Sequence, residues 1–506
     1  MRLADRRPGL VFAAALVFLL AGVVLALHAR AEHRAGQGAA ELVPAGALAY
    51  VRLGTDPQRP ADRRLAALAP RLPGYLRQRD RALAALSPAG GLDLRRDVRP
   101  WLGDEVAVAL VDAGGGRFAS VVLAQVARRP GAEALLQRVG GERAAARYRG
   151  TILRRFGSGT AAFVDDFLVV GPEPAVRSAI DAAKDPERAL ARSPAFRDAL
   201  AAEEGGTLQA YVSPRGLRGL GRAQGGVAGA LAALLDHRGL RGLGAAGSAE
   251  RGGLRVTVRR VGAVGAEFSP SLLRRVPADT VAYAGAPSLR ALVGAAGRLG
   301  AGPALQRLRV ALPATAGVNL ERDVLAPLDG EVAAWVSPGG AAPVITLAAR
   351  TRDPRRTRET LARLQQPLAA LLGGPETPPV FEPAEIAGQD AFTLAVTPAL
   401  APTYAVTGST VVASTAPAGL EAYASAPARL AGARAFRAAM PSLPGRVEAL
   451  GFIDPRQLLA LGEQTGLNAG PLSDEAREDL RRVRAAAAVV EREETDTTAE
   501  LFFEIP

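Results

Sequence analysis

Two clusters of charged residues have the types and spacing that could do chemistry. In each cluster an arginine precedes an aspartate, and a glutamate follows the aspartate by eight positions. An arginine beside a carboxylate can bind an anion or a partner protein, so the recurring clusters could form a paired anion or partner site. The same pattern also fits a local ion pair followed by a residue at the start of a strand, and we prefer this structural interpretation. The candidate partner-site residues are Arg96, Asp97, Glu105, Arg322, Asp323 and Glu331.

The scarcity of reactive side chains argues against several enzyme classes. The chain has no cysteine and three histidines, which are His28, His33 and His237. Cysteine nucleophiles, iron–sulfur clusters and metal sites built from several histidines or cysteines are therefore excluded. Lys184 is the one lysine among 62 basic residues, and it ends a predicted helix. We predict no catalytic residue, no cofactor and no metal site.

Two further motifs resemble functional sites but are better explained by structure. Residues 242–247 (GLGAAG) match the glycine spacing of a dinucleotide-binding loop, which needs a strand before it and a helix after it. Here a predicted helix precedes and a strand follows, so we interpret the segment as a strand. Asp165 and Asp166 are adjacent carboxylates between apolar stretches, and the pattern predicts a hairpin turn rather than an acid–base pair.

The N-terminal segment has the composition of a membrane anchor. Gly9–Leu27 contains 19 residues without a charge, and at about 1.5 Å per residue such a helix spans the hydrocarbon core. Arg2, Arg6 and Arg7 precede it, which favours a cytoplasmic N-terminus and an extracytoplasmic body. A cleaved signal peptide is the alternative, although the apolar run is longer than is typical of one. We expect a single-pass protein of the cell membrane with a transmembrane helix at residues 9–28.

The charge balance limits the partners. The formal net charge is +12 and aromatic residues make up 5% of the chain. Few aromatics mean few stacking platforms, so nucleic acid is not an expected partner. A cationic surface would attract anionic lipid or a cell-wall polymer. The expected partners are the membrane through residues 9–28, with an anionic lipid, a cell-wall polymer or an envelope protein as further candidates.

Short motifs recur in the same order in the two halves of the chain. Residues 91–98 (GLDLRRDV) parallel 317–324 (GVNLERDV), and residues 211–215 (YVSPR) parallel 452–456 (FIDPR). The order is kept while the offset drifts by a few residues, which indicates an internal duplication. The predicted organisation is a cytoplasmic tail at 1–8, the helix at 9–28, a linker at 29–39, repeat units at 40–262 and 270–506, and a junction at 263–269.

Hydrophobic patterning predicts a mixture of strands and helices in each unit. In the first unit we expect strands at residues 47–53, 105–112, 118–127, 151–156, 162–170, 208–212 and 254–259, and helices over most of 61–86, after Pro130 and over 174–184. Strand pairs joined by short turns imply antiparallel sheets, with the helices covering one face. The predicted fold class is α+β, with an N-terminal transmembrane helix followed by two duplicated units with antiparallel sheets and covering helices.

One group of motifs points to a family. Residues 43–50 open the body with VPA and close with AY, residues 167–181 read FLVVGPEPAVRSAID, and residues 193–197 read SPAFR. Together they resemble the actinobacterial membrane-anchored proteins grouped as domain of unknown function 3352. The resemblance implies a short basic tail, one membrane helix and a long extracytoplasmic region, and it brings no activity or catalytic residues. The second unit departs from the pattern, because VVAS at 411–414 stands where the first unit has LVVG.

Three functions follow as expectations. The leading one is a non-enzymatic extracytoplasmic region that binds a partner or acts as a scaffold. The first alternative is a carrier or binder of a lipid or other apolar ligand, which would need an apolar cavity of ligand size. The second alternative is a carboxylate-based hydrolase, which would need two carboxyl groups facing each other in a cleft.

Overall fold

A computed structural model describes most of the body of the chain. The described residues are 38–56, 58–72, 94–112, 118–138, 143–156, 159–201, 207–224, 232, 235–237, 239–262, 264–298, 302–340, 342–373, 379–397, 399–464 and 474–505. The predicted tail, transmembrane helix and most of the linker, together with His28 and His33, lie outside them, as does the helix expected beyond residue 72. Within these ranges, no helix is both long and apolar enough to cross a membrane.

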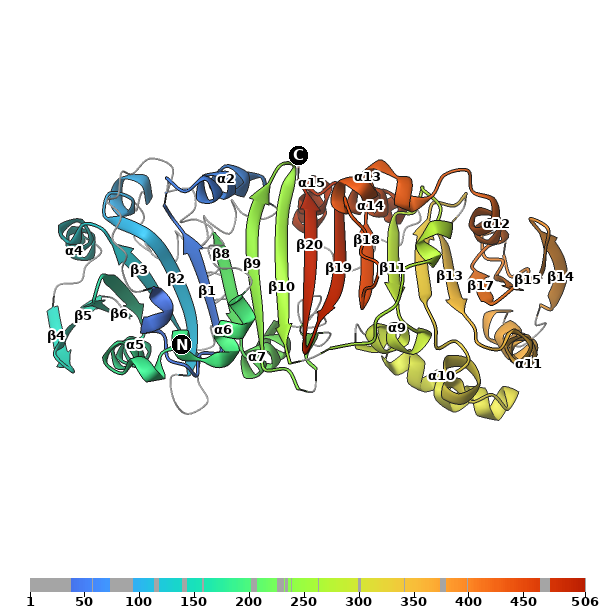
Figure 1. Cartoon of the computed structure of the whole chain (residues 1–506), viewed down its shortest axis with the longest axis horizontal. Coiled ribbons are helices and arrows are strands. Elements are labelled where there is room, and N and C mark those ends of the chain that lie inside the picture. The colour runs from blue at the N-terminus through green and yellow to red at the C-terminus, as the bar shows by residue number, and fades with distance from the viewer. Residues whose placement is uncertain are drawn as a thin grey trace, which may run out of the picture. The chain divides into compact units, whose positions relative to one another are not determined.

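The chain divides into two compact units. One comprises Met1–Ala263 with Thr495–Thr498, and the other comprises Val264–Glu494 with Ala499–Pro506. Each unit mixes helices with strands that pair in the antiparallel sense, as the α+β class requires (Figure 1).

In the first unit the paired strands follow the order β10-β9-β8-β1-β2-β3-β7-β6-β5-β4. The strands are β1 Ala49–Gly54, β2 Leu102–Asp112, β3 Phe118–Val126, β4 Arg143–Tyr148, β5 Thr151–Phe156, β6 Gly159–Val164, β7 Phe167–Gly171, β8 Leu208–Val212, β9 Gly242–Glu250 and β10 Gly253–Val261. The helices are α2 Pro60–Leu68, α4 Arg129–Arg138, α5 Glu173–Lys184, α6 Pro194–Leu200 and α7 Pro214–Gln224, with the short helices η2 Ala39–Leu42, η3 Ala69–Arg71, η4 Leu94–Val98, η5 Pro186–Arg188 and η6 Leu190–Arg192.

In the second unit the paired strands follow the order β20-β19-β18-β11-β12-β13-β17-β16-β15-β14. The strands are β11 Ala282–Ala286, β12 Val332–Ser337, β13 Val344–Arg350, β14 Phe381–Ile386, β15 Gln389–Leu394, β16 Thr403–Thr407, β17 Thr410–Ser414, β18 Ala449–Ile453, β19 Ala485–Glu493 and β20 Asp496–Glu504. The helices are α9 Leu289–Ala296, α10 Gly302–Ala316, α11 Pro354–Gly373, α12 Pro417–Ser425, α13 Arg434–Ala439, α14 Pro455–Gln464 and α15 Asp474–Arg482, with the short helices η8 Leu272–Arg275, η10 Leu320–Leu325 and η11 Leu430–Gly432. This order matches that of the first unit strand for strand.

Both faces of the central strands are covered, whereas the sequence suggested that helices cover one face. In β2, Ala107 and Ala109 belong to a buried cluster that includes Ile180 of α5. Val106 belongs to a separate cluster with Leu136 of α4. The reason is that β2 is apolar at successive positions rather than at alternate ones, which is typical of a strand buried on both sides.

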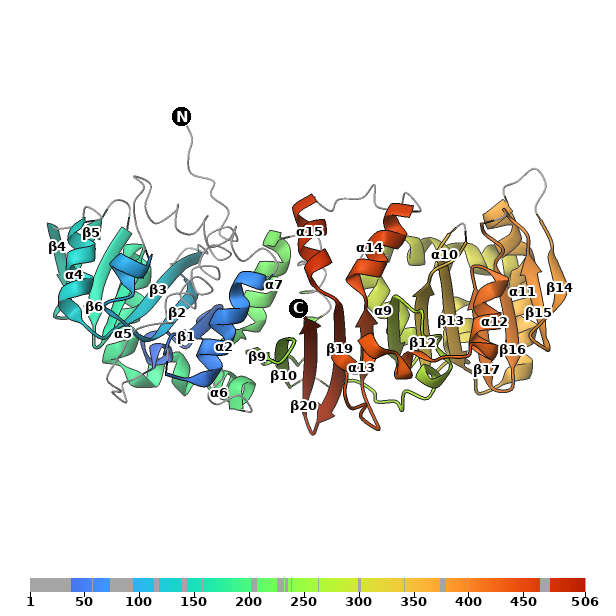
Figure 2. The same cartoon turned by 90° about the horizontal axis from the view of Figure 1, so that it is seen from above.

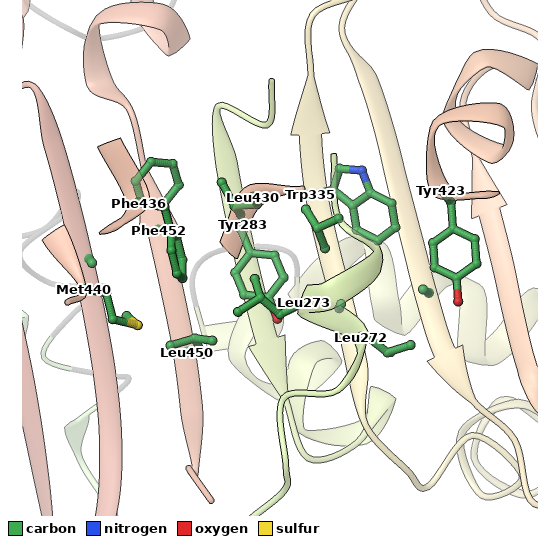
Figure 3. Packing of buried hydrophobic residues seen from close by; sticks show 14 of the residues in the cluster. Leu272, Leu273, Tyr283, Trp335, Tyr423, Leu430, Phe436, Met440, Leu450 and Phe452 are labelled. Carbon is green, nitrogen blue, oxygen red and sulfur yellow. The ribbon is translucent and has the colours of Figure 1, made fainter. Parts of the chain in front are cut away.

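The core of the second unit gathers around Tyr283 on the central strand β11. Its neighbours across the sheet are Trp335 on β12 and Phe452 on β18. Leu272 and Leu273 of η8 belong to the same cluster, and Leu273 lies beside the tyrosine ring (Figure 3). A short helix before the first strand therefore belongs to the core rather than to a linker.

Several predicted elements are confirmed, one is corrected and one strand was missed. The strand at 208–212 is β8, and Asp165 and Asp166 form the turn between β6 and β7. The segment expected as strand at 162–170 is divided by that predicted turn into the end of β6 and the strand β7, and Asp165 in the turn has a positive φ of 49°. The strand β4, with the sequence RAAARY, was not expected, because alanine and arginine give it no period-2 apolar pattern.

Residues 242–247 lie in β9, so the strand interpretation of the glycine motif is confirmed. Gly244 has a packing role there, since a Cβ atom built on it would lie 1.9 Å from the carbonyl oxygen of Ala199 in α6. The glycine allows α6 to lie directly on the sheet.

The substitution Gly244→Ala is expected to lower the free energy of unfolding by about 1–3 kcal/mol, because α6 must move away from β9. Gly219→Ala is the control, since no atom of the described residues lies within 4 Å of a Cβ atom at Gly219 in α7 and alanine favours a helix. Thermal unfolding of both variants measures the difference, and an unchanged midpoint for Gly244→Ala would contradict the packing role.

Candidate functional site

Glu105, on β2, holds the start of the short helix η2. The backbone N–H of Ala39 donates to Glu105 Oε1 at 3.0 Å, and the Tyr50 hydroxyl donates to the same oxygen at 3.4 Å. Arg52 Nε lies 3.3 Å from Oε2. Burial of the Tyr50 ring, together with the negative charge of Glu105, raises the pKa of Tyr50. The Tyr50 hydroxyl therefore stays protonated and can donate.

Glu331, which precedes β12, holds the start of η8 in the second unit. The backbone N–H of Leu272 donates to Glu331 Oε1 at 2.7 Å, and the Ser271 hydroxyl donates to Oε2. Arg350 Nη2 donates in turn to Ser271 Oγ at 3.2 Å. Burial raises the pKa of Glu331, and the bonds from Ser271 and Leu272 act in the opposite direction.

The two glutamates thus have the same structural role in the two units. Each accepts the N–H of the first residue of a 3-10 helix, and each is less than 10% exposed. The first N–H groups of a helix have no partner within it, and a carboxylate at that end satisfies one of them. Glu105 and Glu331 therefore fix η2 and η8 to the sheets.

The first Arg–Asp pair ties a helix to the chain before β2. Asp97 is buried in η4, and Arg96 Nε donates to its Oδ1 at 3.0 Å. Arg138, the last residue of α4, donates to the same oxygen. The Trp101 indole N–H donates to the carbonyl oxygen of Asp97 at 2.8 Å. Asp97 is therefore the centre of a connection between η4 and α4.

The second pair has the same arrangement. Arg322 holds Asp323 in a bidentate contact, with both N–O distances at 3.0 Å. Arg356 in α11 lies 3.5 Å from Asp323 Oδ1, and the backbone N–H of Asn319 donates to Oδ2 at 2.9 Å. The hydrogen bond from the Arg322 guanidinium has the largest effect on the pKa of Asp323 and holds it well below its usual range. The hydrogen bond from the Asn319 N–H lowers the pKa further. Asp323 is therefore ionised at neutral pH.

The structure brings each arginine to its neighbouring aspartate but assigns the glutamate to a different cluster. Among the described residues, Glu105 bonds Ala39, Tyr50 and Arg52, and it makes no bond to Arg96 or Asp97. In the second unit, too, the glutamate and the Arg–Asp pair share no hydrogen bond within the described ranges. The six candidate residues therefore lie in four separate clusters, two around the aspartates and two around the glutamates.

A pair of buried aspartates was missed in the sequence. Asp62 Oδ2 accepts the backbone N–H of Asp56 at 3.2 Å, and Asp62 Oδ1 accepts the Thr207 hydroxyl at 2.8 Å. Burial raises the pKa of Asp62 despite these bonds. The contacts join the end of β1 to the residue before β8, where the N–H of Gly54 also donates to Thr207. The one available signal was an aspartate in the first turn after Pro60.

Two open grooves lie on the second unit. The first has a volume of about 1010 Å³ and runs between α11 and the strands β14, β15 and β16; Glu385, Asp390, Phe392 and Tyr404 are among its lining residues. The second has a volume of about 740 Å³ and separates α10 from α11, which lie side by side in both views (Figures 1 and 2). Leu308, Leu312 and Leu368 line it.

The family can now be stated. The model of the family described as "Protein of unknown function (DUF3352)" matches residues 10–505. The chain belongs to this family. The resemblance noted in the sequence is therefore confirmed at the level of the family, and DUF3352 membership brings no activity with it.

Comparison beyond DUF3352 adds little. No curated protein matches the chain. Crystal form I of TP0453 is 12% identical, with a TM-score of 0.27 over 45% of this chain and 79% of that chain. Crystal form III of TP0453 is 10% identical, with a TM-score of 0.26 over 45% of this chain and 80% of that chain. A likeness this low carries no argument about fold or function.

The substitution Asp323→Asn is expected to lower the unfolding temperature most at neutral pH. The folded pKa of Asp323 lies below its unfolded value of about 3.9. The carboxylate therefore stabilises the fold above that pH, and this contribution is lost as the pH falls through the lowered pKa. Thermal unfolding at neutral and acidic pH measures this contribution. The difference in unfolding temperature between wild type and variant should become smaller in acid.

Glu321→Gln is the matched control, because Glu321 lies on the same short helix and makes an exposed ion pair with Arg309. Such pairs contribute little, so this variant should follow the wild type at both pH values. A pH-independent difference for Asp323→Asn would show that the charge of Asp323 is not what stabilises the fold.

Proposed function

We propose that this DUF3352 protein is a single-pass membrane protein whose extracytoplasmic body binds or scaffolds other envelope components and catalyses no reaction. The observation that carries the proposal is that the recurring carboxylates are buried and already hydrogen-bonded within the protein. Asp97, Asp323, Glu105 and Glu331 are all buried, and all accept bonds from the protein's own backbone or arginines. Carboxylates held in this way support a scaffold and leave little capacity for acid–base chemistry.

The membrane arrangement rests on the N-terminal sequence. Gly9–Leu27 is uncharged, and Arg2, Arg6 and Arg7 precede it. A segment of this length and composition forms a transmembrane helix, with the basic side in the cytoplasm. The body would then lie outside the membrane with its N-terminal end attached to it.

We also infer that the two units arose by duplication. The recurring sequence motifs support this, as do the shared strand order and the equivalent anchors at η2 and η8. A duplicated scaffold presents two surfaces built on the same frame, and these surfaces can diverge independently.

Single-cysteine labelling tests the membrane arrangement, because the chain has no native cysteine. With a membrane-impermeant maleimide on intact cells stripped of their wall, Val310→Cys should be labelled, since Val310 is 67% exposed. Ala4→Cys should be labelled only after lysis. The reverse pattern would contradict the proposed orientation, and no label on Ala4→Cys after lysis would indicate a cleaved signal peptide.

One observation favours the alternative of an apolar ligand. The groove between α10 and α11 is lined mostly by apolar side chains and has the volume of a ligand site. It is open to the surface, however, while the clusters beneath the sheets are filled by buried side chains. A carrier would hold its ligand in this groove rather than in the core.

Native mass spectrometry of the full chain in detergent decides between the two functions. The scaffold proposal expects the native mass to equal the denatured mass. Extra mass that is released on denaturation and lost in Ala311→Trp would favour a carrier, because Ala311 lines the groove and tryptophan would fill it. Ala314→Trp, on the same helix but outside the lining, is the control and should keep any bound ligand.

A further inference from the structure

We propose that this chain associates head to tail, with the hairpin β4–β5 of one copy docking in the groove between α11 and β14–β16 of a second copy. The inference rests on the scaffold function proposed above and names a second copy of the chain as one partner. It follows from two equivalent hairpins whose exposed faces carry opposite charge.

The two hairpins occupy the same place in their units. Among the described strands, β4 pairs with β5 alone and β14 pairs with β15 alone, so each hairpin ends its sheet. Both turns have two residues with positive φ, 47° and 86° at Arg149 and Gly150 and 50° and 74° at Ala387 and Gly388. This turn geometry matches the strand twist, so the two hairpins present the same kind of face.

The charges on that face are opposite in the two units. In the first hairpin Arg147 is directly opposite Ile152, and both are exposed. In the second hairpin Glu385 is directly opposite Asp390, and both are exposed. Side chains opposite each other on paired strands point to the same face of the sheet. Equivalent positions therefore present a cation beside an apolar group in one unit and two carboxylates in the other.

These charges lack partners within the part of the chain that the structure describes. The neighbouring Arg149 and Arg155 pair with Asp181 and Glu173, but no hydrogen bond or ion pair joins Arg147 to another described residue. The same holds for the acidic residues of the other hairpin, which are Glu382, Glu385 and Asp390. The β4–β5 hairpin therefore offers a cation, and the β14–β15 hairpin offers the carboxylates that could pair with it.

The groove beside the acidic hairpin also suits an arginine and an apolar side chain. Phe392 stacks on Tyr404 with 5.4 Å between ring centroids, and Gln365 donates to the Tyr404 hydroxyl at 2.7 Å. Phe392 is 36% exposed. An arginine that lies next to a carboxylate and over an aromatic ring is stabilised by an ion pair and by a cation–π interaction. Ile152, 41% exposed, has an apolar surface to contact in this groove.

Charge also decides which surfaces meet. Two β4–β5 hairpins would set arginines against each other, and two β14–β15 hairpins would set carboxylates against each other. Unlike surfaces must therefore pair, which makes the contact heterologous and able to continue from copy to copy. Pro383 in β14 lacks an N–H, so side chains rather than a strand ladder would form the contact.

Sedimentation velocity of the full chain in mild detergent tests the proposal. The average mass of the wild type should rise with protein concentration at low salt and fall back at about 0.5 M salt, where charges are screened within a few ångströms. Arg147→Glu and Glu385→Arg should each weaken association about tenfold. The chain carrying both substitutions should regain association to within about threefold of wild type, because the pair is restored with its signs exchanged.

Arg192→Glu is the matched control, since Arg192 is an exposed arginine of the first unit and its reversal changes the net charge equally. It should leave association unchanged. A wild type that stays monomeric at every concentration overturns the proposal, and so does association that neither reversal weakens or that the double reversal fails to restore. Neither result alters the labelling pattern that tests the membrane arrangement, so the two proposals can fail separately.

Discussion

A buried glutamate that accepts the first N–H of a short helix is the interaction on which the geometry of each unit depends. Glu105 and Glu331 are removed from water, and a buried carboxylate is tolerated only when its oxygens are bonded. Ala39 and Leu272 supply those bonds, which fixes η2 against β2 and η8 against the start of β12. Leu272 and Leu273 can then join the aromatic core around Tyr283.

The same need for bonding partners explains how the recurring aspartates are held. Asp97 and Asp323 each bring together a local arginine and an arginine from the helix that follows the next hairpin. Removing one partner would leave a buried charge unpaired, which is strongly destabilising. The two units differ at the surface, where Arg147 in one corresponds in place to Glu385 in the other.

Much of this architecture could be predicted from the sequence, and the exceptions have physical reasons. Apolar runs flanked by turn residues predicted β2, β3 and β8. The preserved order of the matching motifs indicated two units. The strand β4 could not be found, because RAAARY forms a strand only through its pairing with β5. The partners of Glu105 and Glu331 could not be found either. They lie 66 and 59 positions away along the chain, and no local pattern encodes such a contact.

Hydrogen–deuterium exchange of the full chain with Glu331→Ala tests most directly whether these glutamates are structural anchors. The account predicts that the amides of η8 exchange about tenfold faster or more, because Leu272 loses its acceptor and the helix its attachment. Glu331→Gln, which keeps an acceptor oxygen, should stay close to the wild type. Unchanged exchange at residues 272–275 in the alanine variant would contradict the account and show that η8 is held by its apolar contacts alone.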